Sequence, residues 1–507
     1  MGTALFLSNV GNRDLGKNGI PLFNAPKKYE NNAEMYKKYC EEIYKEKTGK
    51  ELKYNSLYEF TKELYSSGVY KDLELEPIII KPQIEKILEF HDSVDVILFG
   101  TLQNKRHESD SFFTACIIEY LLKKEFKDKI KKIDICAITD NPSDYVEMFD
   151  YYKKVLDSFN DNNYEAIYLG ITGGTSEMSF GLITNGVIKW ETKAKILYKP
   201  HGSNNVNEVE IGERIFKILK KREYDILEEK HLHKLAAEIG KKYKLIDDWK
   251  VHYLMGKHYK ELFDFKRALE EFEKAEKLAN LKDKKKIREE IKLLSDLDRD
   301  DINSLSIKEN INLYVKLINL LIDNAIRKWE NGEYVDFIGR IFRIEEAILR
   351  AIVEKEFNKS TDLFKIEENG KVIKKFLGFE ELLNENPDIK KYLIEKGIEI
   401  DKGVNRYSLF GILEYLHLNK YKKKNKYGLI YRFITKLNAN NKTKNAPKKL
   451  EKINSLEDLR NKSIIAHGFM GVSKEDIIEL YNENKSNENE IIDDLIKIKK
   501  IIEKILN

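Results

Sequence analysis

The stretch YEAIYLGITGGTSEM, residues 164–178, decides the fold of the N-terminal part of this chain. Its first half is a short apolar run with the composition of a buried strand, and it leads directly into Gly173 and Gly174. Thr175 and Ser176 follow, and a hydroxyl in this position can cap the N-terminus of a helix. A strand, a tight turn and a helix in direct succession are the repeating unit of parallel α/β sheets.

Four more runs of this kind lie in the first 200 residues. They are TALFLSN (3–9), VDVILFG (94–100), IDICAI (133–138) and AKILYKP (194–200). Between them, residues 111–126 and 144–159 carry apolar side chains at three- and four-residue spacing, which is typical of amphipathic helices. The alternation predicts a Rossmann-like α/β domain over residues 1–205.

After about His201 the strand signal ends, and the chain continues as helices rich in Lys, Glu, Ile and Leu. The segment GSNNVNE (202–208) has the composition of a linker. We therefore expect a helical connector domain over 206–310 and a second all-helical domain over 311–507.

Two parts of the helical region have a recognisable packing pattern. Residues 252–275 match the spacing of a tetratricopeptide helix pair, with Met255, Gly256, Tyr259, Ala268, Phe272 and Ala275 at its packing positions. A long helix pair beginning near Ile311 has one apolar face, made by Ile338, Ile341, Phe342, Ile348, Leu349 and Ile352. The Lys- and Asn-rich segments 419–427 and 438–449 are expected to be exposed loops, although their charge could also contact RNA.

The composition limits the classes of function. The chain has 507 residues, 42% of them hydrophobic and 35% charged, which is enough for more than one core. Its formal charge of +4 is too small for a polybasic nucleic-acid-binding surface. Three scattered cysteines do not form a disulfide framework, and no apolar run reaches the roughly 20 residues of a membrane span. A cytoplasmic protein that does not bind membranes is expected.

The glycine turn at 172–175 is the first candidate site. A turn at the start of a helix presents backbone N–H groups, and glycine lets a phosphate or a ribose approach the backbone closely. The turn lacks the third glycine of the dinucleotide-binding motif and the lysine of the phosphate-binding loop. The alternative is a turn that needs glycine for structural reasons only.

Polar residues also follow two other predicted strands. Asn9, Asn12 and Arg13 come after the first, and Thr101, Gln103 and Arg106 come after the second. Because parallel strands end at one edge of a sheet, these residues should meet the glycine turn in a polar pocket. Arg13 and Arg106 are equally compatible with ordinary surface charges.

The segment SLEDLRNKSIIAHGF, residues 455–469, is the second candidate site. Ser455 and the acidic residues after it predict a helix start, and Gly468 predicts its end. On one helix, Arg460 and His467 would share a face and lie about 10 Å apart along the axis. A guanidinium can bind a phosphate and an imidazole can exchange protons at neutral pH, which suits RNA cleavage through the 2′-hydroxyl. A histidine beside a charged surface is the alternative interpretation.

A metal cofactor is not expected from the sequence. The cysteines and histidines form no zinc-binding spacing, and the chain has no carboxylate cluster in sequence. His231 and His233 are two residues apart on a predicted helix, so their side chains should point in different directions.

Together, the two candidate sites resemble those of the CARF-HEPN ancillary ribonucleases of type III CRISPR systems, the Csm and Csx group. ITGGTSEM resembles the Thr-Gly-Gly-Thr turn of the CARF domain, and Arg460-Asn461 through His467 resembles the HEPN signature. The resemblance implies a Rossmann-like CARF domain, a helical connector and an all-helical HEPN domain. The Lys- and Asn-rich segments between 419 and 449 are not part of the core HEPN pattern.

The resemblance also implies roles for individual residues. Cyclic tetra-adenylate or cyclic hexa-adenylate would be the allosteric activator, bound by Asn9, Asn12, Arg13, Thr172, Gly173, Gly174 and Thr175, with Thr101 and Gln103 from a loop that varies in the family. Arg460, Asn461 and His467 would form the ribonuclease centre, with two copies meeting in a homodimer. Some relatives also degrade their activator slowly in the CARF pocket.

The implied activity is metal-independent cleavage of single-stranded RNA, with 2′,3′-cyclic phosphate products, in antiviral defence. No stable association with the CRISPR effector complex is expected. The alternative is a non-catalytic, nucleotide-sensing scaffold protein that acts through its helical half. A metabolic nucleotide enzyme is less favoured, because the third glycine and a catalytic carboxylate pair are both missing.

Overall fold

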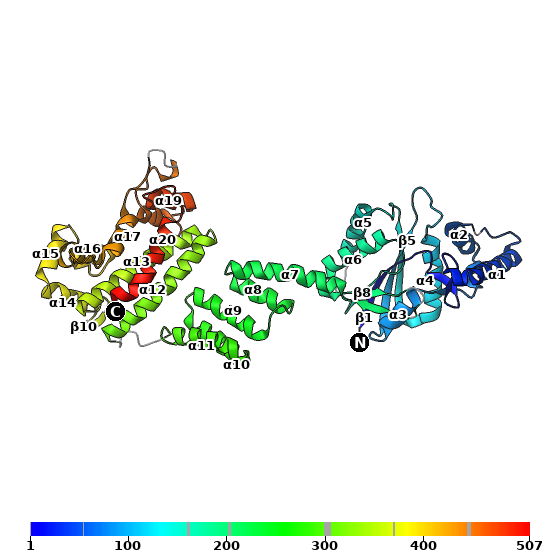
Figure 1. The fold of residues 1–507 in the computed structure, drawn as a ribbon, viewed down its shortest axis with the longest axis horizontal. Helices are drawn as coiled ribbons and strands as arrows, with labels where there is room; N and C mark the ends of the chain where they lie inside the picture. The colour runs from blue at the N-terminus through cyan, green and yellow to red at the C-terminus, as the bar shows by residue number, and fades with distance from the viewer. Residues whose placement is uncertain are drawn as a thin grey trace. The chain divides into compact units, whose positions relative to one another are not determined.

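The structure is a computed structural model that describes residues 2–53, 55–159, 163–200, 203, 205–298, 306–362, 364–368, 371–443 and 448–506. The chain separates into two compact units, residues 1–222 and 223–507, coloured from blue to green and from green to red in Figure 1. We describe each unit by itself. Among the described residues, no helix is long and apolar enough to cross a membrane.

The first unit is built on a six-stranded sheet with the order β6-β5-β1-β7-β8-β9. All neighbouring strands are parallel except β9, which runs antiparallel to β8. The strands are β1 (Thr3–Asn9), β5 (Ser93–Thr101), β6 (Ile130–Ile138), β7 (Ile167–Gly170), β8 (Ala194–Tyr198) and β9 (Asn207–Val209). The five predicted strands are confirmed.

Helices cover both faces of this sheet, as Figure 1 shows. One face carries α3 (Ile80–Leu88) and α4 (Phe112–Phe126), and the other carries α5 (Tyr145–Asp157) and α6 (Ser176–Trp190). The predicted helices at 111–126 and 144–159 correspond to α4 and α5. Because the central strands are buried on both faces, their sequences are almost continuously apolar rather than alternating.

Several elements of this unit were not predicted. A three-stranded sheet, β3-β2-β4, contains β2 (Leu15–Lys17), β3 (Ile20–Pro21) and β4 (Glu76–Pro77), which are too short to produce a periodic pattern. Helices α1 (Glu30–Thr48) and α2 (Leu57–Ser67) pack nearby. The expected linker 202–208 is corrected in part: Asn207 and Glu208 begin β9, and Gly202 and Asn204 lie outside the described residues. A strand at the exposed edge of a sheet can consist of polar residues, so its sequence resembled that of a linker.

The second unit is mainly helical. The helix α7 (Ile211–Glu229) leads into it from the first unit, and the helices after it are α8 (His233–Lys242), α9 (Asp248–Glu261), α10 (Phe265–Leu278), α11 (Leu281–Ser295), α12 (Ile307–Glu330), α13 (Tyr334–Phe357), α14 (Leu377–Glu385), α15 (Pro387–Glu395), α16 (Arg406–Tyr415), α17 (Gly428–Asn438), α18 (Leu456–Lys462), α19 (Lys474–Tyr481) and α20 (Glu490–Leu506). The expectation of a purely helical half is corrected by the antiparallel hairpin of β10 (Phe364–Glu368) and β11 (Lys371–Lys375).

The two predicted packing patterns are confirmed. In the tetratricopeptide-like pair, α9 and α10, Ala268, Phe272 and Ala275 are fully buried, and Gly256 lies against the ring of Phe272. The second pair is α12 and α13, which pack on each other and on α20. All six residues of the expected apolar face belong to the core around α13.

The Lys-rich segment 419–427 is not simply an exposed loop. A π-helical turn at Leu416–Lys420 continues α16. Lys420 lies 3.0 Å and Lys426 2.7 Å from the carboxylate of Glu356 on α13, so both charges are compensated. Lys422, Lys423 and Lys424 are exposed as expected. Residues 444–447 of the second Lys- and Asn-rich segment lie outside the described residues.

The expectation that His231 and His233 point in different directions is wrong. His231 lies before α8 rather than within it, and its φ of +57° is in the left-handed region. This backbone conformation brings the two imidazole rings to 5.5 Å between centroids. A helical periodicity argument fails here because only His233 is helical.

Candidate functional site

A pocket of about 900 Å³ lies at the carboxyl edge of the parallel sheet. Residues that follow β1, β5, β7 and β8 line it, so four strand ends meet at one place as the topology requires. Eight of the nine predicted ligand-binding residues are in its lining, namely Asn12, Arg13, Thr101, Gln103, Thr172, Gly173, Gly174 and Thr175.

The glycines of this pocket allow two strand-end turns to pack against each other. A Cβ atom at Gly11 would lie 2.5 Å from the backbone nitrogen of Gly174, and one at Gly173 would collide with the carbonyl oxygen of Asn9. Gly174 has a φ of +76°, which L side chains rarely adopt. The packing of the two turns therefore requires glycine at these positions. The same packing leaves the backbone of the turn at the pocket surface.

The hydroxyl and amide side chains in the lining are held in place by other parts of the fold. Thr172 Oγ1 accepts hydrogen bonds from the backbone N–H of Lys199 at 2.8 Å and from Gln83 Nε2 at 3.3 Å. Gln103 donates to Asp110 at 3.0 Å through its side-chain amide. Thr175 caps α6 by accepting from the N–H of Met178 at 3.2 Å. These hydrogen bonds fix the orientation of the three side chains.

Two predicted residues have a different environment from the rest. Asn9 is fully buried and does not line the pocket; its Oδ1 accepts a 2.5 Å hydrogen bond from the hydroxyl of Tyr152. It supports the turn from beneath. Arg13 is exposed at the pocket, and its Nε donates to the carbonyl oxygen of Asn24 at 3.1 Å.

Lys199 and Asp14 were not among the predicted ligand-binding residues, and they are the ionisable groups buried most deeply in the lining. Lys199 follows β8 and is 6% exposed, and burial lowers the pKa of its amine. Asp14 is fully buried, and burial raises its pKa to about 7 although the N–H of Gly11 donates to it at 2.5 Å. The position of Lys199 directly after the last parallel strand was the signal that could have identified it.

The second candidate site differs from its prediction. The single helix expected over 455–469 is wrong, because α18 ends at Lys462. The Ser463 hydroxyl donates to the carbonyl oxygen of Arg460 at 2.8 Å. The backbone N–H of Met470 donates to the carbonyl oxygen of Lys462 at 3.0 Å. The intervening residues form a turn, so Arg460 is on a helix and His467 is in the loop that follows it.

Arg460 lies at the edge of a network of charged side chains. Its guanidinium is 5.3 Å from the ring centroid of Phe342, and Arg406 lies 5.1 Å from the same ring. Arg406 pairs with Glu345 at 2.7 Å and with Glu457 at 2.6 Å. Arg406 forms the ion pairs with both carboxylates, and no acidic side chain pairs with Arg460 among the described residues.

Glu345 is a buried carboxyl group within this network. It is fully buried on α13, and its Oε1 has no hydrogen-bond partner among the described residues. Burial raises its pKa to about 7, against the opposing charges of Arg406 and Arg460. The polar surroundings of Arg460 are thus sensitive to pH near neutrality.

His467 is exposed, whereas the residues on either side of it are half-buried. The backbone N–H of His467 donates to the carbonyl oxygen of Asn461 at 3.3 Å, which keeps the turn against the end of α18. Asn461 Oδ1 lies 3.4 Å from Arg460 Nη1, so the three predicted catalytic residues are joined by hydrogen bonds. The next residues include Phe469, which is 95% exposed.

No family model and no curated protein sequence matches the chain. Solved structures do match, and one of them is the Csm6 of Enterococcus italicus bound to cyclic hexa-2′-fluoro-hexa-dAMP. The match has a TM-score of 0.50 at 12% sequence identity and covers 100% of this chain and 96% of that one. At this identity the likeness shows the fold alone: the chain shares the fold of that protein, with an N-terminal α/β part followed by a mainly helical part.

Proposed function

We propose that the protein is a ribonuclease that cleaves single-stranded RNA without a metal ion when a cyclic oligoadenylate binds its N-terminal pocket. The observation that carries the proposal is the likeness to Csm6 over the whole chain, combined with both predicted motifs in the expected order. Its setting would be antiviral defence in a type III CRISPR system, in the cytoplasm and apart from the effector complex.

The pocket supports a ligand with several phosphates. The turn 172–175 precedes the N-terminus of α6, where backbone N–H groups and the helix dipole favour an anion. Lys199 adds a cationic group at the carboxyl end of β8. Cyclic tetra-adenylate and cyclic hexa-adenylate both have phosphates and adenine bases, and the Csm6 structure holds a cyclic hexa-nucleotide analogue.

A homodimer would complete both sites. Beside the pocket residues Asn141, Pro142 and Ser143, α5 and α6 expose large apolar side chains: Tyr145, Val146 and Phe180. In the second unit, Phe469 and Ile464 are exposed on the turn that carries His467. Contact with a second copy would cover such groups and bring two Arg460–His467 pairs to one RNA strand.

In this mechanism RNA supplies its own nucleophile. His467 exchanges a proton with the 2′-hydroxyl or with the leaving oxygen, and Arg460 stabilises the charge of the phosphate. Asn461 positions both residues through the two contacts described above. The products would end in a 2′,3′-cyclic phosphate. The activator acts by binding the active arrangement of the dimer more tightly than the inactive one.

The test is cleavage of a fluorogenic single-stranded RNA in the presence of a chelator, with cyclic tetra-adenylate, cyclic hexa-adenylate or no activator. We expect one ring size to trigger cleavage and His467→Ala to abolish it. Recovery of shortened or linearised activator would reveal that the pocket also degrades its ligand. No cleavage with either ring would contradict the proposal and favour a nucleotide-sensing scaffold protein.

A further inference from the structure

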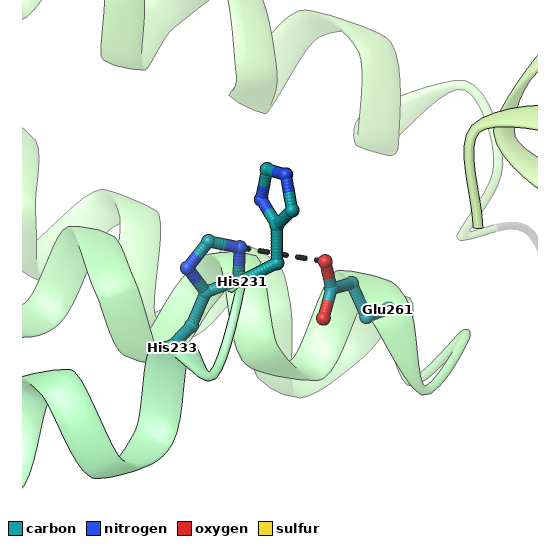
Figure 2. A group of neighbouring side chains, drawn as sticks. All are labelled: His231, His233 and Glu261. Carbon is teal, nitrogen blue, oxygen red and sulfur yellow. Dashed lines mark ion pairs between the residues drawn. The ribbon is translucent and has the colours of Figure 1, made fainter. Parts of the chain in front are cut away.

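Two histidines and a glutamate meet in the second unit, where the turn before α8 packs against the end of α9. His231 is in the turn, His233 is the first residue of α8 and Glu261 is the last residue of α9. One ligand atom from each of the three lies within 4.8 Å of the others. Figure 2 shows both imidazoles and the carboxylate gathered at this junction.

His233 has an environment that its contacts within the described chain do not fully satisfy. Its side chain is 1% exposed, and its Nε2 lies 3.4 Å from Glu261 Oε1, at the long end of a hydrogen bond. Its Nδ1 has no hydrogen-bond partner among the described residues. Nε2, the nitrogen that faces Glu261, can instead coordinate a cation, because 3.4 Å is about the separation of two ligand atoms on a tetrahedral zinc ion with bonds of about 2.0–2.1 Å.

Arg327 on α12 is the group with which a cation would compete. Its Nε lies 2.8 Å from Glu261 Oε1, yet this N–H has no hydrogen bond of acceptable geometry. The guanidinium therefore holds the carboxylate by charge rather than by a directed hydrogen bond. The end of α9 is fixed independently, since Asn324 Nδ2 donates to the carbonyl oxygen of Glu261 at 3.2 Å.

We propose that His231, His233 and Glu261 bind a zinc ion. Two imidazole nitrogens and one carboxylate oxygen are a zinc donor set, whereas magnesium and calcium prefer oxygen ligands alone. Three protein ligands leave a fourth position for water. The ion fastens the turn between α7 and α8 to the end of α9. This site shares no residue with the N-terminal pocket or with Arg460 and His467, so it is independent of the proposed ribonuclease function.

The test is zinc binding to the untagged, full-length protein after dialysis against a chelator and its removal. Isothermal titration calorimetry should give one zinc ion per chain, and excess zinc should raise the melting temperature. His231→Ala, in a partly exposed turn, should weaken binding by at least about tenfold and remove the thermal shift. The matched control is His252→Ala, which removes a histidine of α9 that pairs with Glu271 at 2.7 Å and should leave zinc binding unchanged.

A second variant examines the competition. Arg327→Gln removes the guanidinium but keeps a polar side chain, and it should bind zinc more tightly than the wild type because the carboxylate is released. Absence of zinc binding in the wild type, equal binding in His231→Ala, or unchanged affinity in Arg327→Gln would each overturn the assignment. Circular dichroism of each variant establishes that the helices are intact.

Discussion

The N-terminal pocket and the Arg460–His467 segment are built in opposite ways. The pocket is concave, four strand ends form it, and it encloses fully buried Asp14 and nearly buried Lys199. The other segment is a short helix followed by an exposed turn, with Phe469 almost completely accessible. The first could enclose a ligand within a single chain, whereas the second is open to solvent. This difference is the one that the proposed ligand-controlled ribonuclease requires.

The largest expected effect is the loss of RNA cleavage in Arg460→Ala or His467→Ala. Removal of a general acid–base group or of a phosphate-binding cation typically costs about 10²- to 10⁴-fold in rate. Initial rates of cleavage of a fluorogenic RNA measure the effect. Arg432→Ala is the matched control, because Arg432 forms an exposed ion pair with Glu483. If the control lost as much activity as Arg460→Ala, the comparison between the two regions would fail.

A smaller effect is expected when the glycine turn is altered. In Gly173→Ala the new Cβ collides with the carbonyl oxygen of Asn9 and lies 2.8 Å from Asp14 Oδ2, so the turn must shift. The activator concentration for half-maximal cleavage should rise by about tenfold or more, which corresponds to about 1.4 kcal/mol of binding free energy.

The control for this change is Gly471→Ala, since a Cβ there meets no atom within 4 Å. That variant should respond to the activator as the wild type does. An unaltered response in Gly173→Ala, with the fold intact, would show that the ligand does not contact the turn.

The buried carboxyl group of the pocket predicts a pH dependence of stability. The pKa of Asp14 is about 7 in the folded chain and 3.8 as its ordinary value, so between these values the folded state binds a proton that the unfolded state has released. The contribution of this proton to the free energy of unfolding is fully present below about pH 4. It is lost as the pH rises through about 7, by up to about 1.4 kcal/mol per pH unit.

Denaturant unfolding of the wild type and of Asp14→Asn at about pH 5 and about pH 8 measures this effect. The wild type should lose more stability between the two pH values than the variant does. Equal losses would mean that Asp14 does not titrate in this range.

The smallest effect is expected from the Lys-rich segment. Alanine at Lys422, Lys423 and Lys424 removes exposed charges only, and each phosphate contact depends on salt. Cleavage should change by less than about threefold at physiological ionic strength. A larger loss that shrinks as the salt concentration rises would assign the segment to RNA binding.

The sequence was sufficient to predict the parallel sheet and the core of α13, because buried strands and amphipathic helices leave strong apolar patterns. It failed where a contact distant in sequence determines local structure. Ile464-Ile465-Ala466 reads as a continuing helix, yet the Ser463 hydroxyl ends α18 and Ile465 packs over Gly339. Lys199 and Asp14 became candidates only when the strand order brought them to one pocket. The left-handed backbone of His231 likewise has no sequence signal.

The central claim is that separate sites bind the activator and cut RNA. The most direct test measures binding of the activating cyclic oligoadenylate and RNA cleavage in the same two proteins, His467→Ala and Gly173→Ala. We predict that His467→Ala binds the activator as the wild type does and does not cleave at any concentration, whereas Gly173→Ala binds weakly and regains cleavage at high activator concentration. Loss of activator binding in His467→Ala, or cleavage that does not depend on the activator in the wild type, would contradict the account.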